Sequence, residues 1–232
     1  MRIAIADDDA ELLEQLSAAL DGTSHQYEKF RAGTDLLTSL RRETYDVVLV
    51  DWNMPGRTGL EIIQWANEAL ENPPAFILLT SRADKADVVR GLEAGAIDYV
   101  VKPESHEVIF ARIEAASRRI RPPDVDRHAD FGDYRIDRQL RTISWKGEEI
   151  KLTAKETELA TLFFDNLNRP LSRAYIFGQV WGGLPDVESR TLDIHISRIR
   201  SKLNLRPQNG FAIQTVFGFG YRMDRCSDSD EA

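Results

Sequence analysis

The first half of the chain alternates short apolar runs with amphipathic stretches of helical period. The apolar runs, which are expected to be buried strands, are residues 3–6, 47–50, 76–80 and 99–101. A more polar run at 25–30 is expected to be an edge strand, and helices are expected over 11–20 and 105–119. Strands that are apolar throughout and alternate with helices predict a doubly wound, five-stranded parallel sheet covered on both faces.

The second half follows a different pattern. Alternating apolar and polar residues over 132–153 predict a small antiparallel sheet. Three helices are then expected, starting at a capping box formed by Thr153 and Glu156, at Ser172, and over 189–203. A hairpin is expected over 211–223, turning at Phe217 and Gly218. Three helices followed by a hairpin indicate a winged helix-turn-helix.

Two prolines and a polar stretch mark the boundary between these halves. Pro122 and Pro123 stop the preceding helix, because proline cannot continue it. The expected organisation is a first domain at 1–121, a linker at 122–129, a second domain at 130–225, and a disordered acidic tail at 226–232.

Composition narrows the class of protein. The 232 residues are enough for two domains, and no run approaches the roughly 18 to 20 apolar residues that a membrane span needs. The N-terminus turns acidic before a signal-peptide core could form. The single cysteine, Cys226, excludes an internal disulfide and favours a cytoplasmic protein.

The charge is distributed unevenly. The whole chain carries −8, of which residues 1–121 contribute −7. Residues 189–206, in contrast, carry five Lys or Arg and one Asp, a local +4. A basic stripe on one helix of a small domain is typical of nucleic-acid binding, although a solvated helix face gives the same pattern.

Polar residues follow four of the predicted parallel strands. These residues are Asp7, Asp8 and Asp9 after the first strand, Asp51, Thr80 and Lys102. They should meet, because ligand sites of open parallel sheets lie beyond the carboxyl ends of the strands. Clustered carboxylates repel one another, and a bound Mg²⁺ would relieve that repulsion. Asp51 could then act as a nucleophile that accepts a phosphoryl group, with Lys102 neutralising charge and Thr80 donating a hydrogen bond.

Each of these residues also has an ordinary explanation when taken alone. The three aspartates could favour a helix N-terminus, and Thr80 and Lys102 could be unremarkable strand-end residues. Their convergence on one edge favours a site. A phosphohydrolase of the haloacid dehalogenase type is the enzymatic alternative, but those enzymes usually carry an Asp-x-Asp nucleophile after the first strand. Asp51 follows a later strand and stands alone.

The motifs resemble those of a known family. The blocks "IAIADDDAELL", "LVDWNMPGRTGLE", "ILLTSR" and "GAIDYVVKP" are similar to the signatures of bacterial response-regulator receiver domains, which have a flavodoxin-like fold. The blocks "LTAKETELATLF", "LSRAYIFGQVW", "SRTLDIHISRIRSKL" and "TVFGFGYR" resemble the winged-helix effector of the OmpR/PhoB subfamily. The resemblance covers residues 1–224.

The resemblance implies a transcription regulator and not an enzyme. Asp51 would be the phosphoacceptor, and a sensor histidine kinase would be the phosphate donor. The Mg²⁺ ligands would be Asp8 directly, Asp7 through water, Asp51, and the backbone carbonyl of Asn53. Lys102 would contact the phosphoryl group and precede a cis Pro103, while Thr80 and Tyr99 would form the switch pair. Activation would promote a homodimer on promoter DNA, and the loop "GGLPDVE" (182–188) is where relatives can touch RNA polymerase.

The sequence departs from the family at the surface where relatives dimerise. Ile97 replaces the first of two aspartates before the switch Tyr, Glu104 replaces an aromatic residue, and Val88 and Val108 occupy positions that are often charged. The polar residues that remain on this surface are Asp98, Arg112 and Arg119. We expect a more apolar dimer face, and a regulator that binds DNA without phosphorylation is the alternative.

The helix over 189–203 is expected to have two sides. The core side comprises Leu192, Ile196, Ile199 and Leu203. The expected DNA contacts are Arg198 with base edges, Thr191 and His195 with bases or phosphates, Arg200 with phosphate, and also Arg190, Lys202, Thr215 and Arg222. Arg190 opposes the helix dipole, which favours an anionic partner, whereas Lys202 suits the dipole without DNA. The hairpin tip carries Phe217 where relatives commonly have a basic residue, so a weaker minor-groove contribution is expected.

Overall fold

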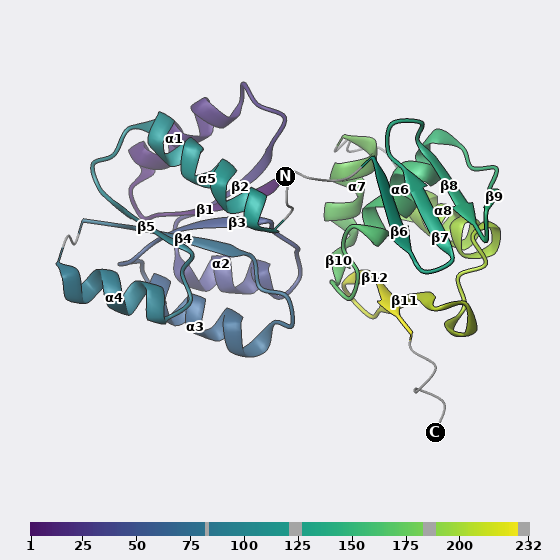
Figure 1. The fold of residues 1–232 in the computed structure, drawn as a ribbon. Coiled ribbons are helices and arrows are strands. Elements are labelled where there is room, and N and C mark those ends of the chain that lie inside the picture. The colour runs from purple at the N-terminus through teal and green to yellow at the C-terminus, as the bar shows by residue number, and fades with distance from the viewer. Residues whose placement is uncertain (82–83, 121–126, 183–188, 227–232) are drawn as a thin grey trace. The chain divides into compact units, whose positions relative to one another are not determined.

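The computed structural model describes residues 1–81, 84–120, 127–182 and 189–226. The chain divides into two compact units, Met1–Pro123 and Asp124–Ala232, which we call the N-terminal and C-terminal units (Figure 1). Within the described residues, no helix has the length and apolarity needed to cross a membrane.

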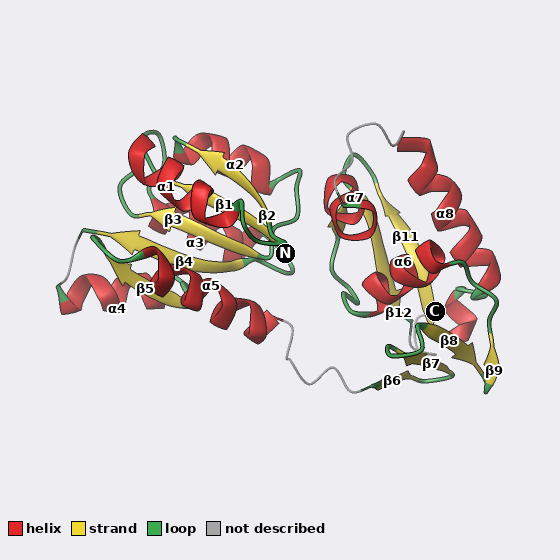
Figure 2. Cartoon of the chain, turned by 90° about the horizontal axis from the view of Figure 1, so that it is seen from above, coloured by secondary structure: helices red, strands yellow, loops and turns green. Residues whose placement is uncertain are grey.

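The N-terminal unit is built on one parallel sheet. Its strands are β1 (Arg2–Ala6), β2 (Gln26–Phe30), β3 (Val47–Asp51), β4 (Ala75–Thr80) and β5 (Asp98–Val101). Their order is β2-β1-β3-β4-β5, which can be followed in Figure 2. The more polar strand β2 lies at one edge, and this confirms the fold class expected from the sequence.

Helices cover both faces of this sheet (Figure 1). They are α1 (Ala10–Leu20), α2 (Gly33–Leu40), α3 (Gly59–Ala69), α4 (Lys85–Glu93) and α5 (His106–Ile120). The apolar strands alternate their side chains between two cores, so Ile3 and Ile5 pack with α1 and α5, whereas Ala4 and Ala6 pack with α2 and α3. Because β3 is buried along its whole length, its last residue is held at a fixed place in the fold.

The C-terminal unit contains two small sheets around three helices. The first sheet is antiparallel and comprises β6 (His128–Phe131), β7 (Tyr134–Asp137), β8 (Thr142–Trp145) and β9 (Glu148–Glu149). The helices are α6 (Ala154–Phe164), α7 (Arg173–Trp181) and α8 (Ser189–Lys202), followed by a 3₁₀ turn, η1 (Pro207–Asn209). The second sheet comprises β10 (Leu171–Ser172), β11 (Phe211–Val216) and β12 (Gly220–Arg225).

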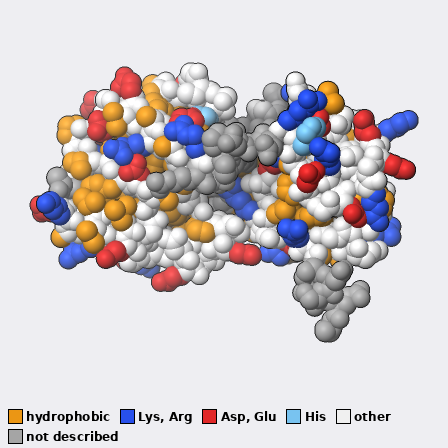
Figure 3. Space-filling view, viewed as in Figure 1, with side chains coloured by type: hydrophobic (Ala, Val, Ile, Leu, Met, Phe, Trp, Pro, Cys, Tyr) orange, Lys and Arg blue, Asp and Glu red, His pale blue; other side chains and the backbone are white. Residues whose placement is uncertain are grey.

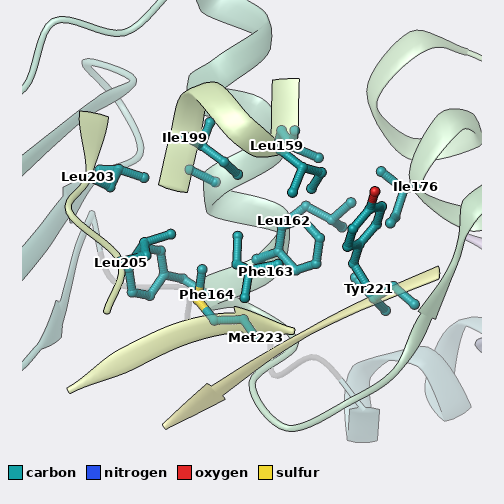
Figure 4. Close-up of a cluster of buried hydrophobic side chains, with 14 of the residues drawn as sticks. Leu159, Leu162, Phe163, Phe164, Ile176, Ile199, Leu203, Leu205, Tyr221 and Met223 are labelled. Carbon is teal, nitrogen blue, oxygen red and sulfur yellow. The ribbon is translucent and has the colours of Figure 1, made fainter. Parts of the chain in front are cut away.

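The three helices and the β11–β12 hairpin share one apolar core. Leu159, Phe163, Ile199 and Met223 are among its buried side chains, and Figure 4 shows how they meet between the helices and the hairpin. All four residues expected on the core side of α8 are buried. The capping box of Thr153 and Glu156 is present, and the winged helix-turn-helix prediction is confirmed.

Two local details differ from the sequence expectation. Strand β10 was not expected, because a two-residue strand has no alternation to detect; it pairs with β12 and makes the hairpin part of a three-stranded sheet. The expected linker, 122–129, overlaps β6, since His128 and Ala129 pair with β7. Those two residues are therefore strand, and residues 122–126 of the linker lie outside the described residues. The expected tail falls largely at 227–232, which are also outside them.

Candidate functional site

The carboxyl ends of four parallel strands bring the expected polar residues to one edge. β3 lies between β1 and β4, so Asp51 stands between Asp7, which follows β1, and Thr80, which ends β4. Carboxylate oxygens of Asp7, Asp8 and Asp51 all lie within 4.8 Å of one another. The predicted convergence of these aspartates is present in the structure.

Backbone hydrogen bonds fix two of the three carboxylates. Asp7 is fully buried, and its Oδ1 accepts the N–H of Asp9 at 3.0 Å. Asp51 is also buried, and its Oδ2 accepts the N–H of Asn53 at 2.7 Å. Asp8, in contrast, is exposed. The cluster thus has an ordered inner part and one carboxylate that faces solvent.

Lys102 links the inner carboxylates. Its Nζ lies 2.5 Å from Oδ2 of Asp7 and 2.6 Å from Oδ1 of Asp51. Its backbone N–H donates to the carbonyl of Thr80 at 2.7 Å, and the Lys102–Pro103 peptide bond is cis. Burial alone would lower the pKa of Lys102, but the hydrogen bonds to Asp51 and Asp7 hold that pKa above its ordinary value.

The site holds more negative than positive charge. The cluster contains three carboxylates, and the ammonium group of Lys102 pairs with two of them, Asp7 and Asp51. Burial raises the pKa of Asp7, although the hydrogen bonds from Lys102 and Asp9 oppose that rise. Clustered carboxylate oxygens with an excess of negative charge fit a hard divalent cation such as Mg²⁺, which prefers oxygen ligands. The side-chain oxygens of Asp7, Asp8 and Asp51 are suitably close for this purpose.

The expected switch residues lie beside the cluster. Thr80 is fully buried at the end of β4, one residue beyond Leu79, which pairs with Asp51. Tyr99, on β5, is half-buried, and Gly91 of α4 approaches its ring so closely that a Cβ there would lie 3.4 Å from it. Thr80 therefore lies next to the strand that ends in Asp51, whereas Tyr99 lies on β5 against Gly91 of α4.

The structure settles the place of one aspartate named from the sequence and adds one residue that sequence reasoning missed. Asp9 caps α1 by accepting the N–H groups of Glu11 and Leu12, so it belongs to the helix start and not to the carboxylate cluster. Gly59 begins α3 directly against the end of β3; a Cβ there would lie 2.4 Å from the carbonyl oxygen of Asp51. The helix-start role was the alternative considered for the three aspartates, and Asp9 alone takes it, whereas no sequence signal identifies Gly59.

Apolar side chains are exposed on α4 and β5. Val89, Leu92 and Val101 are 50 %, 47 % and 38 % exposed, and hydrophobic side chains gather over these elements in Figure 3. The expected surface residues are half-buried: Val88 in α4, Ile97 just before β5, and Val108 in α5.

The polar residues of the same surface pair within the unit. Nη1 of Arg112 lies 2.7 and 2.9 Å from the two carboxylate oxygens of Asp98. Arg119 lies in α5, but its side chain is outside the described part of the structure. The surface thus combines an internally paired Asp–Arg couple with exposed apolar groups.

Helix α8 presents two exposed cations. Arg190 and Arg198 are exposed, and neither has a hydrogen bond or ion pair among the residues that the structure describes. Thr191 and His195 are half-buried; Nδ1 of His195 is 2.8 Å from the carbonyl oxygen of Thr191, and its ring packs edge-on against Trp181. On the hairpin, Thr215 is exposed.

Three other expected DNA contacts are engaged inside the C-terminal unit. Arg200, expected to meet phosphate, donates from Nη2 and Nε to the carbonyl oxygen of Ile213 at 2.7 and 3.1 Å. The guanidinium therefore reaches back to β11 and holds the hairpin, and the expected phosphate contact of Arg200 stays a prediction. Lys202 forms a 2.7 Å ion pair with the buried Glu156.

Arg222 likewise has a partner close by. Its Nε lies 2.5 Å from Oδ1 of Asp224, two residues further along β12. The spacing of residues along a helix or strand does not show such pairings, because long side chains can turn away from the face on which their Cα lies.

Residues 183–188, most of the loop considered for RNA polymerase, lie outside the described residues.

Comparison with protein families matches both units. Residues 3–114 match the response regulator receiver domain, and residues 147–223 match the family described as transcriptional regulatory protein, C terminal. The two matches coincide with the parallel sheet that carries the acidic cluster and with the helices that carry the basic stripe.

Similar proteins extend over nearly the whole chain. The DNA-binding response regulator MtrA of Mycolicibacterium paratuberculosis is 32 % identical over 221 residues, 95 % of this chain and 97 % of its own. The probable transcriptional regulator ycf27 of Cyanophora paradoxa is 34 % identical over 235 residues, covering 98 % of both chains. Among solved structures, the response regulator DrrB, a Thermotoga maritima OmpR/PhoB homolog, is 32 % identical over 96 % of this chain and 98 % of its own, with a TM-score of 0.46.

Proposed function

The chain belongs to the response regulators that join a receiver domain to a C-terminal DNA-binding domain, and we propose that phosphorylation of Asp51 controls its binding to promoter DNA in the cytoplasm. Its relatives are transcriptional regulators and not enzymes, so the phosphohydrolase alternative is set aside. Hereafter the N-terminal unit is the receiver and the C-terminal unit is the effector. The buried Asp51 beside Lys102 is the observation that carries the proposal.

Asp51 would attack a phosphorylated histidine of a sensor kinase. A carboxylate oxygen of Asp51 would form the new P–O bond while the P–N bond breaks, and the leaving imidazole would take a proton from solvent. Lys102 lies 2.6 Å from Oδ1 of Asp51, so its ammonium can neutralise charge on the phosphoryl oxygens. The N–H of Asn53 holds the other carboxylate oxygen and fixes the side-chain orientation.

Mg²⁺ is the cofactor that these residues suit. Asp8 and Asp51 would bind it directly, Asp7 through water, and Asn53 through its backbone carbonyl. When bound, the ion supplies positive charge to the phosphoryl oxygens. The excess of carboxylates over ammonium groups in the cluster supports this assignment.

Phosphorylation would act through Thr80 and Tyr99 on the surface of α4, β5 and α5. The hydroxyl of Thr80 would move towards the phosphoryl group, and Tyr99 would turn inward, so that a dimer-competent state becomes more populated. Because Asp98 and Arg112 already pair with each other, the apolar side chains would supply much of the contact between two receivers.

Sedimentation of the full chain treated with beryllofluoride tests this dimer. We expect wild type to dimerise and Val108→Glu, which places a charge on that surface, to remain monomeric. Equal dimerisation of the two proteins would contradict the proposed face.

The effector would bind DNA with α8 in the major groove. Arg198 would reach base edges, Arg190 would meet phosphate, and Thr191 and His195 would line the same groove. Thr215 would contact the DNA backbone, while Arg200 holds β11 to α8, Lys202 pairs with Glu156 of α6, and Arg222 pairs with Asp224. Two effectors of a dimer would occupy adjacent half-sites about one helical turn apart.

Intact-mass measurement after incubation with acetyl phosphate and Mg²⁺ tests the phosphoacceptor. Wild type should gain the mass of one phosphoryl group, and Asp51→Asn should gain none, because it lacks the nucleophilic carboxylate. Asp35→Asn, which alters an exposed aspartate in the first turn of α2, is the matched control and should label like wild type. Labelling of Asp51→Asn to the wild-type extent would refute the assignment.

A further inference from the structure

Phe217 stands at the tip of the β11–β12 hairpin with its side chain in solvent. Its exposure is 101 %, the largest of any bulky hydrophobic side chain in the described residues. Single exposed hydrophobic residues are common on proteins and need no explanation by themselves. Phe217 differs from the other exposed hydrophobic residues because it lies at the tip of a hairpin that is attached to α8.

The turn at the tip does not require an aromatic residue. The N–H of Phe219 donates to the carbonyl of Val216 at 3.0 Å, which closes a four-residue turn, and Gly218 takes the third position with a φ of +71°. A positive φ at the third position of such a turn favours glycine, whereas the second position has no requirement for an aromatic residue. The fold therefore explains Gly218 but does not explain Phe217.

The hairpin is fixed to the helix that carries the exposed cations. Near the tip, the hydroxyl of Tyr221 donates to Oδ1 of Asp193 on α8 at 2.6 Å, and the opposite residue of the pair is Thr215. Further back, Arg200 of α8 binds the carbonyl oxygen of Ile213. The tip projects only one residue pair, Val216 with Gly220, beyond the Tyr221 anchor. Phe217 is thus held at a set position beside the half of α8 that starts with Arg190.

The hairpin lacks the charge expected of a phosphate-binding wing. No charged residue occurs from Phe211 to Tyr221, and Arg222 is paired with Asp224. A groove contact at the tip would therefore be apolar. Proteins that bind the minor groove insert apolar side chains, phenylalanine among them, between base steps and partly unstack them.

On the proposed function of the effector as a DNA-binding domain, we propose that Phe217 is a specificity-determining residue, a wedge that enters the minor groove flanking the major groove occupied by α8. There it selects sequences by how easily a base step opens. Pyrimidine–purine steps unstack most easily, so such a step is favoured opposite the hairpin. The contact adds affinity without adding an ionic contact.

The test uses the full chain and DNA duplexes selected by wild type from a randomised pool. 2-Aminopurine is placed at successive base steps of the duplex. When wild type binds, the fluorescence of this base should increase at one step at the edge of the site, because unstacking increases its fluorescence. Phe217→Ala should lose that signal and bind on the order of tenfold more weakly, with the slope of log affinity against log salt unchanged. Phe217→Arg should restore affinity with a slope that is steeper by about one.

Leu140→Ala is the matched control, because Leu140 is 64 % exposed in the same unit but lies between β7 and β8, away from the hairpin. It should bind like wild type. Wild-type affinity and fluorescence in Phe217→Ala would overturn the wedge. So would a loss seen only on duplexes with two half-sites and not on a single half-site, because that pattern indicates a contact between two protein copies. Failure of wild type to select any sequence would instead refute DNA binding by the effector.

Discussion

The receiver and the effector manage charge in opposite ways. In the receiver, Asp7, Asp8 and Asp51 lie close together with the one ammonium group of Lys102, so an excess of negative charge remains at the carboxyl edge of the sheet. In the effector, Lys202 and Arg222 are neutralised by carboxylates of the same unit, and Arg200 is satisfied by a backbone carbonyl. The receiver site thus keeps an excess of negative charge, whereas the effector pairs several of its cations within the unit.

This contrast separates charged residues that bind partners from those that hold structure. In the receiver, the shortage of positive charge points to an external cation. In the effector, Arg190 and Arg198 have no partner within the described residues, and they are the candidates for DNA contact. Exposure and lack of a partner identify them better than their position in a basic stripe.

Removal of the one ammonium group should produce the largest effect. Lys102→Met leaves the buried Asp7 and Asp51 without their shared partner, and we expect the receiver to lose about 2–4 kcal/mol of stability without Mg²⁺. Added Mg²⁺ should restore much of that loss, since the ion binds the folded cluster. Hydrogen exchange of peptides from β1 and β3 measures this in the full chain.

The control for this change is Lys29→Met, which removes an exposed pair with Glu14 on the same unit. Its effect on stability should be small, because water screens an exposed ion pair, and should be independent of Mg²⁺. A loss in Lys102→Met that Mg²⁺ does not reduce would show that the carboxylates do not bind the ion.

Two cations of α8 should behave differently when each is replaced. Arg198→Ala should lose about 1–3 kcal/mol of discrimination between the selected site and a variant with one base pair changed, with little change in stability. Lys202→Ala should retain discrimination but destabilise α6, because it removes the partner of the buried Glu156. Binding titrations and hydrogen exchange of residues 154–164 measure the two effects. Equal loss on specific and random DNA in Arg198→Ala would argue against base readout.

The sequence predicted the receiver site more completely than the effector surface. The carboxyl ends of parallel strands lie at one edge of the sheet, and this alone brings Asp7, Asp51 and Lys102 to the same edge. The partners of Arg200 and Lys202 are on β11 and α6, and nothing in the spacing along α8 indicates them. Side-chain pairing across elements depends on packing, which the pattern of one helix does not contain.

Acid should affect the effector through Glu156, and this is the smallest expected effect. Burial raises the pKa of Glu156, but the hydrogen bonds from Lys202 and from the N–H of Thr153 outweigh burial and hold that pKa below its ordinary value. A carboxylate with a lowered pKa stabilises the fold above its unfolded pKa of about 4.3, and this stability is lost as the pH falls through the folded pKa.

In Lys202→Ala the loss between these two pKa values should be smaller, because the ion pair that lowers the folded pKa of Glu156 is gone. Hydrogen exchange of residues 154–164 between pH 6 and pH 3, corrected for the intrinsic pH dependence of exchange, measures it. Identical pH profiles for wild type and Lys202→Ala would show that this pair does not set the acid stability of α6.

The central claim is that a phosphoryl group on Asp51 increases the affinity with which α8 and the hairpin bind DNA. Its most direct test is the affinity of the full chain for its selected DNA, measured with Mg²⁺ before and after treatment with acetyl phosphate, for wild type and for Asp51→Asn. We predict tighter binding after treatment in wild type alone. Equal affinity before and after treatment in a wild-type protein whose mass confirms phosphorylation would contradict the account.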